Sequence, residues 1–178
     1  MKSTMKSPMT LSFLSRLYSK FLALPAFRVN LLIGGITALA LIMALISQYI
    51  FGLHPCVLCL YQRVPFVVVI ILSVIGSIFC TSAKPALWLS SLALFINAGI
   101  AVFHSGVERK WWAGLTGCSS PDLSGSIDEL MARIQNAPVA RCDEIPWDLF
   151  GLSMANYNVA LCLGLAVFIL LYLKSKRA

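Results

Sequence analysis

The sequence predicts an all-α integral membrane protein, a four-transmembrane-helix bundle with one long outer loop that carries a short interfacial helix. Two observations predict this class. Hydrophobic residues make up 59% of the chain, charged residues make up 12%, and the mean hydropathy is +0.85, which describes no ordinary soluble domain. In addition, Lys, Arg, Asp and Glu are absent from four runs, residues 29–62, 64–83, 85–107 and 149–173. Each run can hold the roughly 20 apolar residues that a helix needs to cross a bilayer.

We expect a single membrane domain over residues 1–178, with helices near 30–51, 64–80, 86–104 and 154–173. The first helix should end where Gly52, His54 and Pro55 interrupt its apolar run. Loops 52–63 and 105–153 then lie on one side of the membrane, and the terminal segments 1–29 and 174–178 lie on the other. Because backbone groups in lipid must bond to one another, the helices should form a closed bundle.

The basic residues indicate the orientation of this bundle. The termini and the connection after the second helix carry only basic charges: Lys2, Lys6, Arg16, Lys20, Arg28, Lys84, Lys174, Lys176 and Arg177. All seven acidic residues lie between Glu108 and Asp148 together with four basic ones, so the long loop has a net charge of 4 − 7 = −3. The positive-inside rule therefore predicts cytoplasmic termini and periplasmic loops 52–63 and 105–153.

The same charges exclude other classes. The formal net charge of +7 reflects topology and does not indicate nucleic-acid binding, which needs a soluble basic face. The apolar run before Arg28 is short and is interrupted by Arg16 and Lys20, so we expect the first helix, and not a cleaved signal peptide, to direct insertion.

Six cysteines divide into two groups under this topology. Cys56, Cys59, Cys118 and Cys142 fall on the outward side, where an oxidising compartment allows two disulfides. Cys80 falls at the cytoplasmic end of the second helix and Cys162 near the middle of the fourth. We expect these last two to be small apolar packing residues.

The C-x-x-C pair, Cys56 and Cys59, favours thiol–disulfide chemistry. Four structural cysteines are the first alternative, but a bridge across so short a loop contributes little stability, and thiol–disulfide enzymes use this spacing repeatedly. A zinc site with four thiolates is the second, but residues 118 and 142 do not form another C-x-x-C. Leu60 stands where a haem-attachment motif requires His. The spacing thus favours a redox pair and no metal.

Arg63 follows the pair by four residues. If the second helix begins near Pro55, then Cys56, Cys59 and Arg63 lie at i, i+3 and i+7 and share one face. The helix N-terminus and the guanidinium would both favour a thiolate there. Pro65 complicates such a start, because a proline inside a helix removes a hydrogen bond. A membrane anchor is the alternative role for Arg63, but an arginine so close to a dithiol at membrane depth favours stabilisation of an anion.

The long loop contains one helical pattern, "SIDELMARI" at residues 126–134. Ser126 and Glu129 form a capping box, and an apolar stripe follows at i, i+3, i+4 and i+7. We expect this helix to lie on the membrane surface, with Trp111, Trp112 and Trp147 as interfacial anchors. A plain packing role for the helix is an open alternative to a hinge role.

Three segments together resemble the DsbB family of disulfide bond formation proteins. They are "PCVLCLYQR", "HSGVERKWWAGLTGC" and "CDEIPWDLFGLSM", and the resemblance runs in order from the first helix to the end of the fourth. It implies a quinone-dependent thiol oxidase of the bacterial inner membrane that reoxidises a DsbA-like periplasmic donor.

The resemblance also implies residue roles. Cys56 and Cys59 match the membrane-proximal pair that faces the quinone, and Cys118 and Cys142 match the loop pair that faces the donor. Arg63 matches the family's quinone-site arginine. His104 and Met154 match positions that adjoin the quinone.

The chemistry agrees with this implication. A DsbA-type donor has a reduction potential of about −120 mV, so its reoxidation needs a strong electron acceptor. The chain has no dinucleotide-binding, haem or flavin motif, which leaves a lipid-soluble quinone, ubiquinone or menaquinone, as the expected cofactor from the membrane pool. Electrons are expected to pass from Cys118 and Cys142 to Cys56 and Cys59, with the loop as a mobile carrier.

Two alternatives remain at this stage. A non-enzymatic four-helix scaffold or small transporter explains the topology but not the outer cysteines or Arg63. A reductase of the vitamin K epoxide reductase kind shares the four-helix and C-x-x-C features, but its quinone-facing pair is expected late in the chain.

Overall fold

The computed structural model describes residues 23–114, 140–145 and 147–176. The helices in these ranges are α2 (Ala26–Tyr49), α3 (Val57–Ile78), the short 3-10 helix η1 (Cys80–Ser82), α4 (Ala83–Glu108) and α6 (Met154–Ser175). Two short strands, β1 (Asp148–Leu149) and β2 (Leu152–Ser153), form an antiparallel hairpin before α6. Cys118 and the pattern at 126–134 lie outside the described residues.

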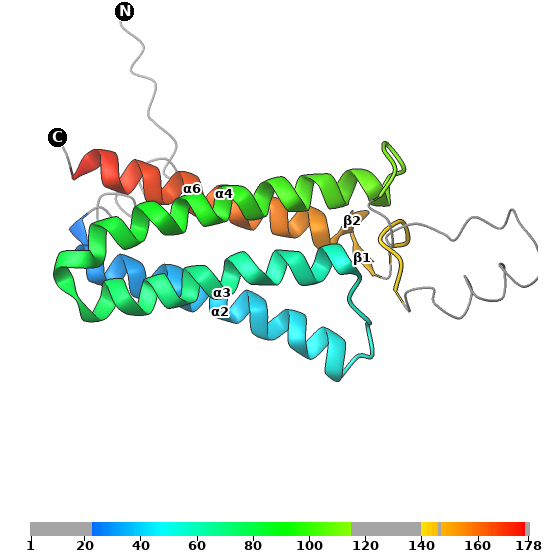
Figure 1. The fold of residues 1–178 in the computed structure, drawn as a ribbon, viewed down its shortest axis with the longest axis horizontal. Helices are drawn as coiled ribbons and strands as arrows, with labels where there is room; N and C mark the ends of the chain where they lie inside the picture. The colour runs from blue at the N-terminus through cyan, green and yellow to red at the C-terminus, as the bar shows by residue number, and fades with distance from the viewer. Residues whose placement is uncertain (1–22, 115–139, 146, 177–178) are drawn as a thin grey trace, which may run out of the picture.

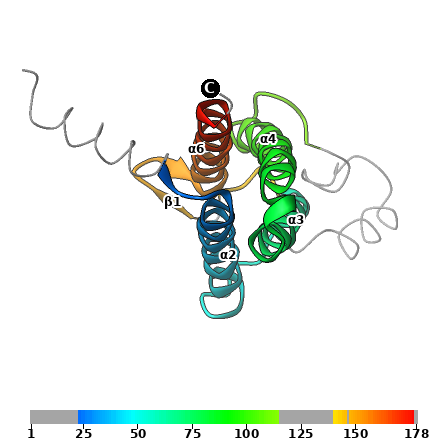
Figure 2. The same cartoon turned by 90° about the vertical axis from the view of Figure 1, so that its left-hand side faces the viewer.

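Four of these helices are long and apolar enough to cross a membrane: α2, α3, η1 joined to α4, and α6. They run side by side along the long axis of the molecule (Figure 1). Seen from one end, α3 lies between α2 and α4, and α4 lies between α3 and α6 (Figure 2). The four-helix membrane fold predicted from the sequence is confirmed.

The two ends of the bundle differ. The start of α2 and the end of α6 lie at one end, where the Tyr172 hydroxyl donates to the carbonyl of Leu24 at 2.9 Å (Figure 1). The link from α2 to α3, the end of α4, the β1–β2 hairpin and residues 140–145 lie at the other end. This arrangement brings the C-x-x-C pair to the same end as the segment that contains Cys142.

The start of α3 differs from the expected position near residue 64. The prediction placed the start after Arg63 because the charge-free run begins there, and it assigned residues 52–63 to a loop. The helix instead begins at Val57, capped by Cys56, whose sulfur accepts the backbone N–H of Cys59 at 3.4 Å. A single arginine does not stop a helix, and α3 also continues through Pro65.

The other boundaries differ less. Helix α2 begins at Ala26 and not near 30, directly after Pro25, and it ends at Tyr49. Helix α4 extends beyond the expected 86–104 at both ends, to Ala83 and Glu108. The longer α4 brings Glu108 into the fold as a helical residue one turn after His104.

Buried apolar residues of all four long helices form one core. Its members come from every helix: Val29 and Ile33, Phe66 and Val69, Leu87 and Leu94, and Ala166 and Ile169. Hydrogen bonds also join the helices, since the Asn30 amide donates to the carbonyl of Ala83 at 2.9 Å and the Ser91 hydroxyl donates to that of Ala166 at 3.3 Å. Such bonds suit a membrane bundle, where helices gain little from hydrophobic contact with each other.

Cys162 and Cys80 differ in their packing. Cys162 is fully buried in the core, as predicted. Cys80 is exposed in the single chain, at the start of η1, so the prediction that it packs inside the bundle was wrong. The turn after α3 directs it outward.

Gly76 provides a test of close helix packing. A Cβ atom at this position would lie 2.7 Å from the Cβ of Ala86 and 2.7 Å from the amide of Asn30, so something must shift. We expect Gly76→Ala to destabilise the bundle by about 1–3 kcal/mol through overpacking, measured as a lower thermal midpoint in detergent. Gly164→Ala is the control, because nothing lies within 4 Å of its added Cβ, and its midpoint should not fall. Equal midpoints for both variants would contradict the close packing.

Candidate functional site

The C-x-x-C pair lies where α3 begins. Cys56 is the N-cap residue and is 5% exposed, whereas Cys59 in the first turn is half-buried. The Cys56 thiol donates to the Cys59 sulfur, with the two sulfurs 3.2 Å apart. A small movement would bring them to the S–S length of about 2.05 Å. The pair is therefore placed to change between dithiol and disulfide.

Two residues from other parts of the chain meet Cys56. They are His104, near the end of α4, and Cys142, in the part of the long loop described at residues 140–145. Both are buried, and Cys142 has no exposed surface. The Cys56 sulfur, the Cys142 sulfur and a His104 ring nitrogen all lie within 4.8 Å of one another. The structure thus brings together a cysteine of the first outer segment and a cysteine of the second.

A small apolar cluster encloses this meeting point. Leu58 and Val107 are almost completely buried beside Cys56 and Cys142, and Phe103 packs against them. It is separate from the main core of the bundle. The Cys56 sulfur therefore lies in a site with little access to water.

Charged residues flank Cys142. The Arg141 guanidinium contacts the Asp143 carboxylate at 2.8 Å and the Glu144 carboxylate at 2.9 Å. The hydrogen bond from Arg141 holds the pKa of the Asp143 carboxyl below its usual range. These contacts pair the charges of the segment with one another, while Cys142 is buried in the cluster.

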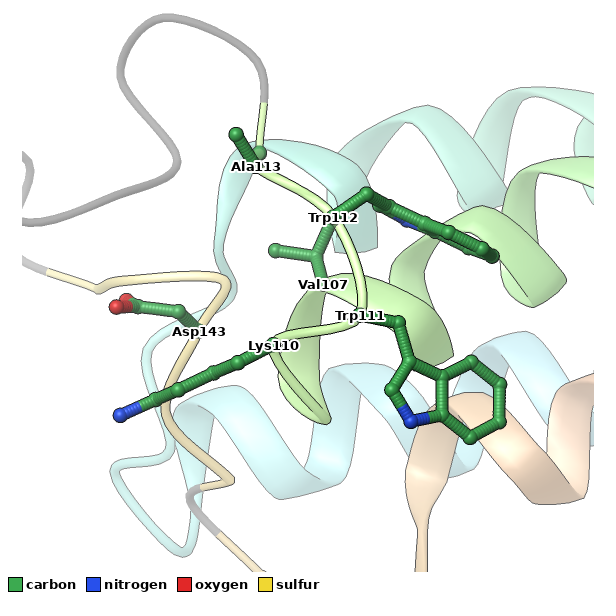
Figure 3. Close-up of a pocket in the computed structure, with 7 residues that line it drawn as sticks. Val107, Lys110, Trp111, Trp112, Ala113 and Asp143 are labelled. Atoms are coloured by element: carbon green, nitrogen blue, oxygen red, sulfur yellow. The ribbon is translucent and has the colours of Figure 1, made fainter.

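A hollow of about 380 Å³ lies beside the cluster, where α4 ends. Figure 3 shows Asp143 and the extended Lys110 side chain on the left of the view, Val107 and Ala113 near its centre, and Trp111 and Trp112 on the right. The Trp112 indole stacks on Phe103, with ring centroids 6.0 Å apart, and donates to the Phe103 carbonyl at 2.9 Å. Trp111 and Trp112 are exposed at this end of the bundle, and their role as membrane anchors stays a prediction.

A chain of side-chain amides orients His104. The Cys162 thiol donates to the Asn158 carbonyl at 3.2 Å, and the Asn158 amide donates to the Gln62 carbonyl at 2.6 Å. The Gln62 amide in turn lies 3.0 Å from Nδ1 of His104. An amide NH₂ is only a donor, so in this arrangement Nδ1 accepts and Nε2 carries the proton. Nε2 lies 3.4 Å from the Cys56 sulfur, so the ring presents a donor to that sulfur.

A carboxylate faces the same ring nitrogen. Glu108, one turn after His104 in α4, has an oxygen 3.6 Å from Nε2 and is buried. Its other oxygen accepts a short hydrogen bond from the hydroxyl of Ser153, the residue that caps α6. This hydrogen bond connects the end of α4 to the start of α6 next to His104.

Arg63 has a different partner. It is half-buried on α3, one turn after Cys59, and its guanidinium donates to the side-chain carbonyl of Gln48 on α2 at 2.7 Å. Residues four apart on a helix share a face, so Arg63 and Cys59 lie on one side of α3. The arginine thus also joins α2 to α3 near the pair.

Comparison with known proteins identifies the chain. Residues 27–172 match the family model described as disulfide bond formation protein DsbB. The chain belongs to the DsbB family. It is 29% identical over 155 residues to the disulfide bond formation protein B of Xanthomonas oryzae, covering 82% of this chain and 89% of that protein. A second relative of that name, from Stutzerimonas stutzeri, is 23% identical over 140 residues, covering 74% of this chain and 84% of that protein. An uncharacterized protein of Rickettsia prowazekii is 31% identical over 154 residues, covering 83% of this chain and 90% of that protein.

Family membership supports a multi-pass membrane protein of disulfide bond formation, as the sequence predicted. Of the residues that the DsbB resemblance singled out, the structure brings Cys56, Cys59, His104 and Cys142 together. Met154 is the first residue of α6 and is 39% exposed; its role at a quinone stays a prediction. Cys118 lies outside the described residues, so its pairing with Cys142 also stays a prediction.

Four residues of this DsbB-family site were missed by the sequence analysis: Gln62, Glu108, Ser153 and Asn158. The sequence contains signals for three of these residues. Gln62 and Asn158 are polar residues inside charge-free apolar runs, and such residues usually face the bundle interior. Glu108 follows His104 by four positions, which places both on one helix face. Ser153 gave no signal, because only the fold brings the start of α6 beside α4.

Proposed function

We propose that this protein is a membrane thiol:quinone oxidoreductase that reoxidises a DsbA-like periplasmic disulfide donor. The observation that carries the proposal is the meeting of Cys56 and Cys142 within 4.8 Å. Thiol–disulfide exchange requires contact between sulfurs, and this contact connects the outer loop to the pair at the membrane.

The cysteines of this chain can carry out each step of thiol–disulfide exchange. A donor thiolate opens a disulfide between Cys118 and Cys142, and the released Cys142 thiolate attacks the Cys56–Cys59 disulfide at Cys56. The second thiolate of the donor then attacks the mixed disulfide with Cys118, and the donor leaves with an internal disulfide. The freed Cys118 thiolate attacks Cys142, which restores the Cys118–Cys142 disulfide and releases Cys56 as a thiolate. One S–S bond breaks as another forms at every step, so two electrons reach Cys56 and Cys59 for each donor oxidised. The released Cys59 holds the electrons as a thiolate, and the Nε2–H of His104 donates to the Cys56 sulfur at 3.4 Å.

A quinone fits the residues near Cys59. Quinones present carbonyl oxygens and an apolar tail. Arg63 offers five N–H donors, and the neighbouring side chains Leu60, Tyr61 and Val64 are exposed and largely apolar. When bound, ubiquinone or menaquinone would supply the two-electron acceptor that the chain lacks. Arg63 would hold it, together with His104 and Met154 if the resemblance applies to those positions.

We further propose that the protein lies in the bacterial inner membrane with both termini cytoplasmic. The basic terminal segments and the loop with a net charge of 4 − 7 = −3 support this orientation. It places the sulfur cluster at the periplasmic surface, where a soluble donor can reach the loop.

The test uses the purified full chain in detergent, a reduced DsbA-like protein and a short-chain quinone. We expect one donor disulfide to form for each quinone reduced, followed by donor thiol counting and quinone absorbance. Ubiquinone and menaquinone analogues are compared in parallel. Donor oxidation without loss of quinone, or no oxidation with either analogue, would contradict the proposal.

A further prediction concerns Gln62. The methionine side chain has a volume similar to that of glutamine. Gln62→Met therefore keeps the packing but removes the donor to Nδ1 of His104 and the acceptor for the Asn158 amide. With its orienting hydrogen bond lost, His104 should no longer hold its donor toward Cys56, and we expect donor oxidation to slow by about tenfold, equivalent to about 1.4 kcal/mol. Stopped-flow mixing of reduced donor with the oxidised protein measures this rate.

Thr37→Val is the matched control for Gln62→Met. Thr37 is also a buried polar residue of a long helix, but within the part of the chain that the structure describes its hydroxyl bonds to the α2 carbonyls of Ile33 and Gly34. We expect its rate to equal that of the wild type. A Gln62→Met rate equal to the control's would show that the amide chain does not affect the exchange.

A further inference from the structure

The cluster of Cys56, His104 and Cys142 has a second chemical capability. Its three ligand atoms come from the start of α3, the end of α4 and residues 140–145 of the long loop, and all three residues are buried. Two sulfurs and one imidazole nitrogen form a donor set typical of thiophilic divalent cations such as Zn²⁺. Such ions bind thiolates, so the set exists only when the cysteines are reduced.

The distances fit such an ion. Tetrahedral zinc with Zn–S of about 2.3 Å and Zn–N of about 2.05 Å separates sulfur from nitrogen by about 3.6 Å and sulfur from sulfur by about 3.8 Å. The Cys56 sulfur lies 3.4 Å from Nε2 of His104, and no pair of the three atoms is more than 4.8 Å apart. An inward movement of about 1 Å at most completes the geometry, given the same ideal lengths.

A fourth ligand is also available. Cys59 supplies a further sulfur 3.2 Å from that of Cys56, and C-x-x-C pairs commonly hold two positions of a zinc site. Three thiolates and one imidazole then make the Cys₃His set that structural zinc sites use.

The residues around His104 can accept the ion. Metal binding through Nε2 requires the proton on Nδ1, where it must meet an acceptor. Turning the Gln62 amide presents its carbonyl to Nδ1, and turning the Asn158 amide restores the contact between these two residues. The distances of 3.0 Å between Gln62 and His104 and 2.6 Å between Asn158 and Gln62 allow a hydrogen bond in either direction. Gln62 then acts as the hydrogen-bond partner that orients a metal-bound histidine.

We infer that the fully reduced protein binds one thiophilic divalent cation of the zinc class through Cys56, His104 and Cys142, with Cys59 as the fourth ligand. Each cysteine releases its proton to solvent as its thiolate binds, and no electron is transferred. Binding holds the thiolates and blocks their exchange. The inference needs only reduced cysteines and stands independently of the proposed oxidase function.

The experiment uses the full chain in detergent, reduced with a phosphine that is then removed without air, and titrated with Co²⁺ alone. Co²⁺ replaces Zn²⁺ in thiolate sites and gives thiolate-to-cobalt absorption bands. We expect these bands to saturate at one Co²⁺ per chain, to be displaced by Zn²⁺, and to be absent from the oxidised protein. No quinone or donor is present, so the result is independent of turnover.

Variants locate the ligands. Cys142→Ser and His104→Ala should each weaken Co²⁺ binding by at least about tenfold, since each removes a direct ligand and even outer-shell losses cost 10–100-fold. Cys80→Ser is the control, because this exposed cysteine lies at the start of η1, beyond the far end of α3 from Cys56, and its affinity should match the wild type. Circular dichroism checks the helices of each variant.

A second readout is the rate of alkylation by N-ethylmaleimide, which Zn²⁺ should slow in the wild type and not in Cys142→Ser. The Cys142→Ser variant carries this test even if His104→Ala fails to fold, because Cys142 lies outside the helices. Absence of thiolate bands in the reduced wild type, or unchanged affinity in Cys142→Ser, would overturn the inference.

Discussion

Cys56→Ser and Cys59→Ser should each abolish quinone-linked oxidation of the donor while the protein stays inserted and folded. Either change leaves a single thiol in place of a pair whose sulfurs lie 3.2 Å apart, and a single thiol cannot alternate between dithiol and disulfide. No neighbouring cysteine replaces the function, because Cys142 is needed for exchange with the loop. Turnover should fall to the rate of the reaction without protein, measured by quinone absorbance.

The fold should survive for a structural reason. Cys56 caps α3 through its side chain, and serine is among the most favourable residues at that position, so Cys56→Ser keeps the cap. A bridge over so short a loop also adds little stability. Thermal midpoints and circular dichroism in detergent should therefore remain close to those of the wild type.

Cys162→Ala is the matched control. It too removes a buried thiol, but one that packs in the main core and contacts Asn158. We expect near-normal turnover, because Cys162 has no redox role, with a modest loss of stability from the small cavity. Retained turnover in Cys56→Ser or Cys59→Ser, or a large loss in Cys162→Ala, would reverse the assignment of redox and packing cysteines.

The sequence predicted the membrane helices because their cause is local. A run without charges that is long enough to cross lipid must satisfy its backbone as a helix, whatever its neighbours are. The start of α3 could not be read in this way, because Arg63 interrupts the charge-free run while the helix continues through it. The cap by Cys56 becomes visible only in three dimensions.

The site was predictable in its residue types but not in its contacts. The spacing of Cys56 and Cys59 indicated a redox pair, but nothing in the sequence places Cys142 beside Cys56 and His104. Helices that are apolar all round do not reveal which faces meet. The contact of Gln62 on α3 with Asn158 on α6 was therefore hidden, although each residue was conspicuous as a polar residue in an apolar run.

Arg63→Ala should impair quinone reduction far more than exchange with the donor. Removing one positioned donor that stabilises developing charge costs about 2.7–4 kcal/mol in a well-organised site, which corresponds to roughly 10²–10³-fold. Because Arg63 lies near the start of α3 and is only half-buried, we expect the lower end, about 10²-fold in kcat/KM for quinone. The rate of donor exchange should change little, since Arg63 is one turn beyond Cys59 and bonds to Gln48 of α2.

The contact with Gln48 adds a structural alternative to the membrane anchor. Arg63 joins α3 to α2 through this hydrogen bond of 2.7 Å, so its loss could act by loosening the two helices. Gln48→Ala separates these roles, because it removes the same bond but keeps the guanidinium. If Arg63 acts on the quinone or the Cys59 thiolate, Gln48→Ala should retain most of the activity that Arg63→Ala loses.

Arg63→Lys completes the test. A pure anchor needs only one cation on a long apolar stem, so lysine would restore full activity. A residue that holds a carbonyl oxygen or a thiolate with a planar fork of donors is only partly replaced by lysine, and the apparent KM for quinone should rise. Steady-state kinetics with quinone and donor varied separately decide between these roles. Equal, small effects on both substrates in Arg63→Ala would make Arg63 a membrane anchor, and equal losses in Arg63→Ala and Gln48→Ala would make it a link between α2 and α3.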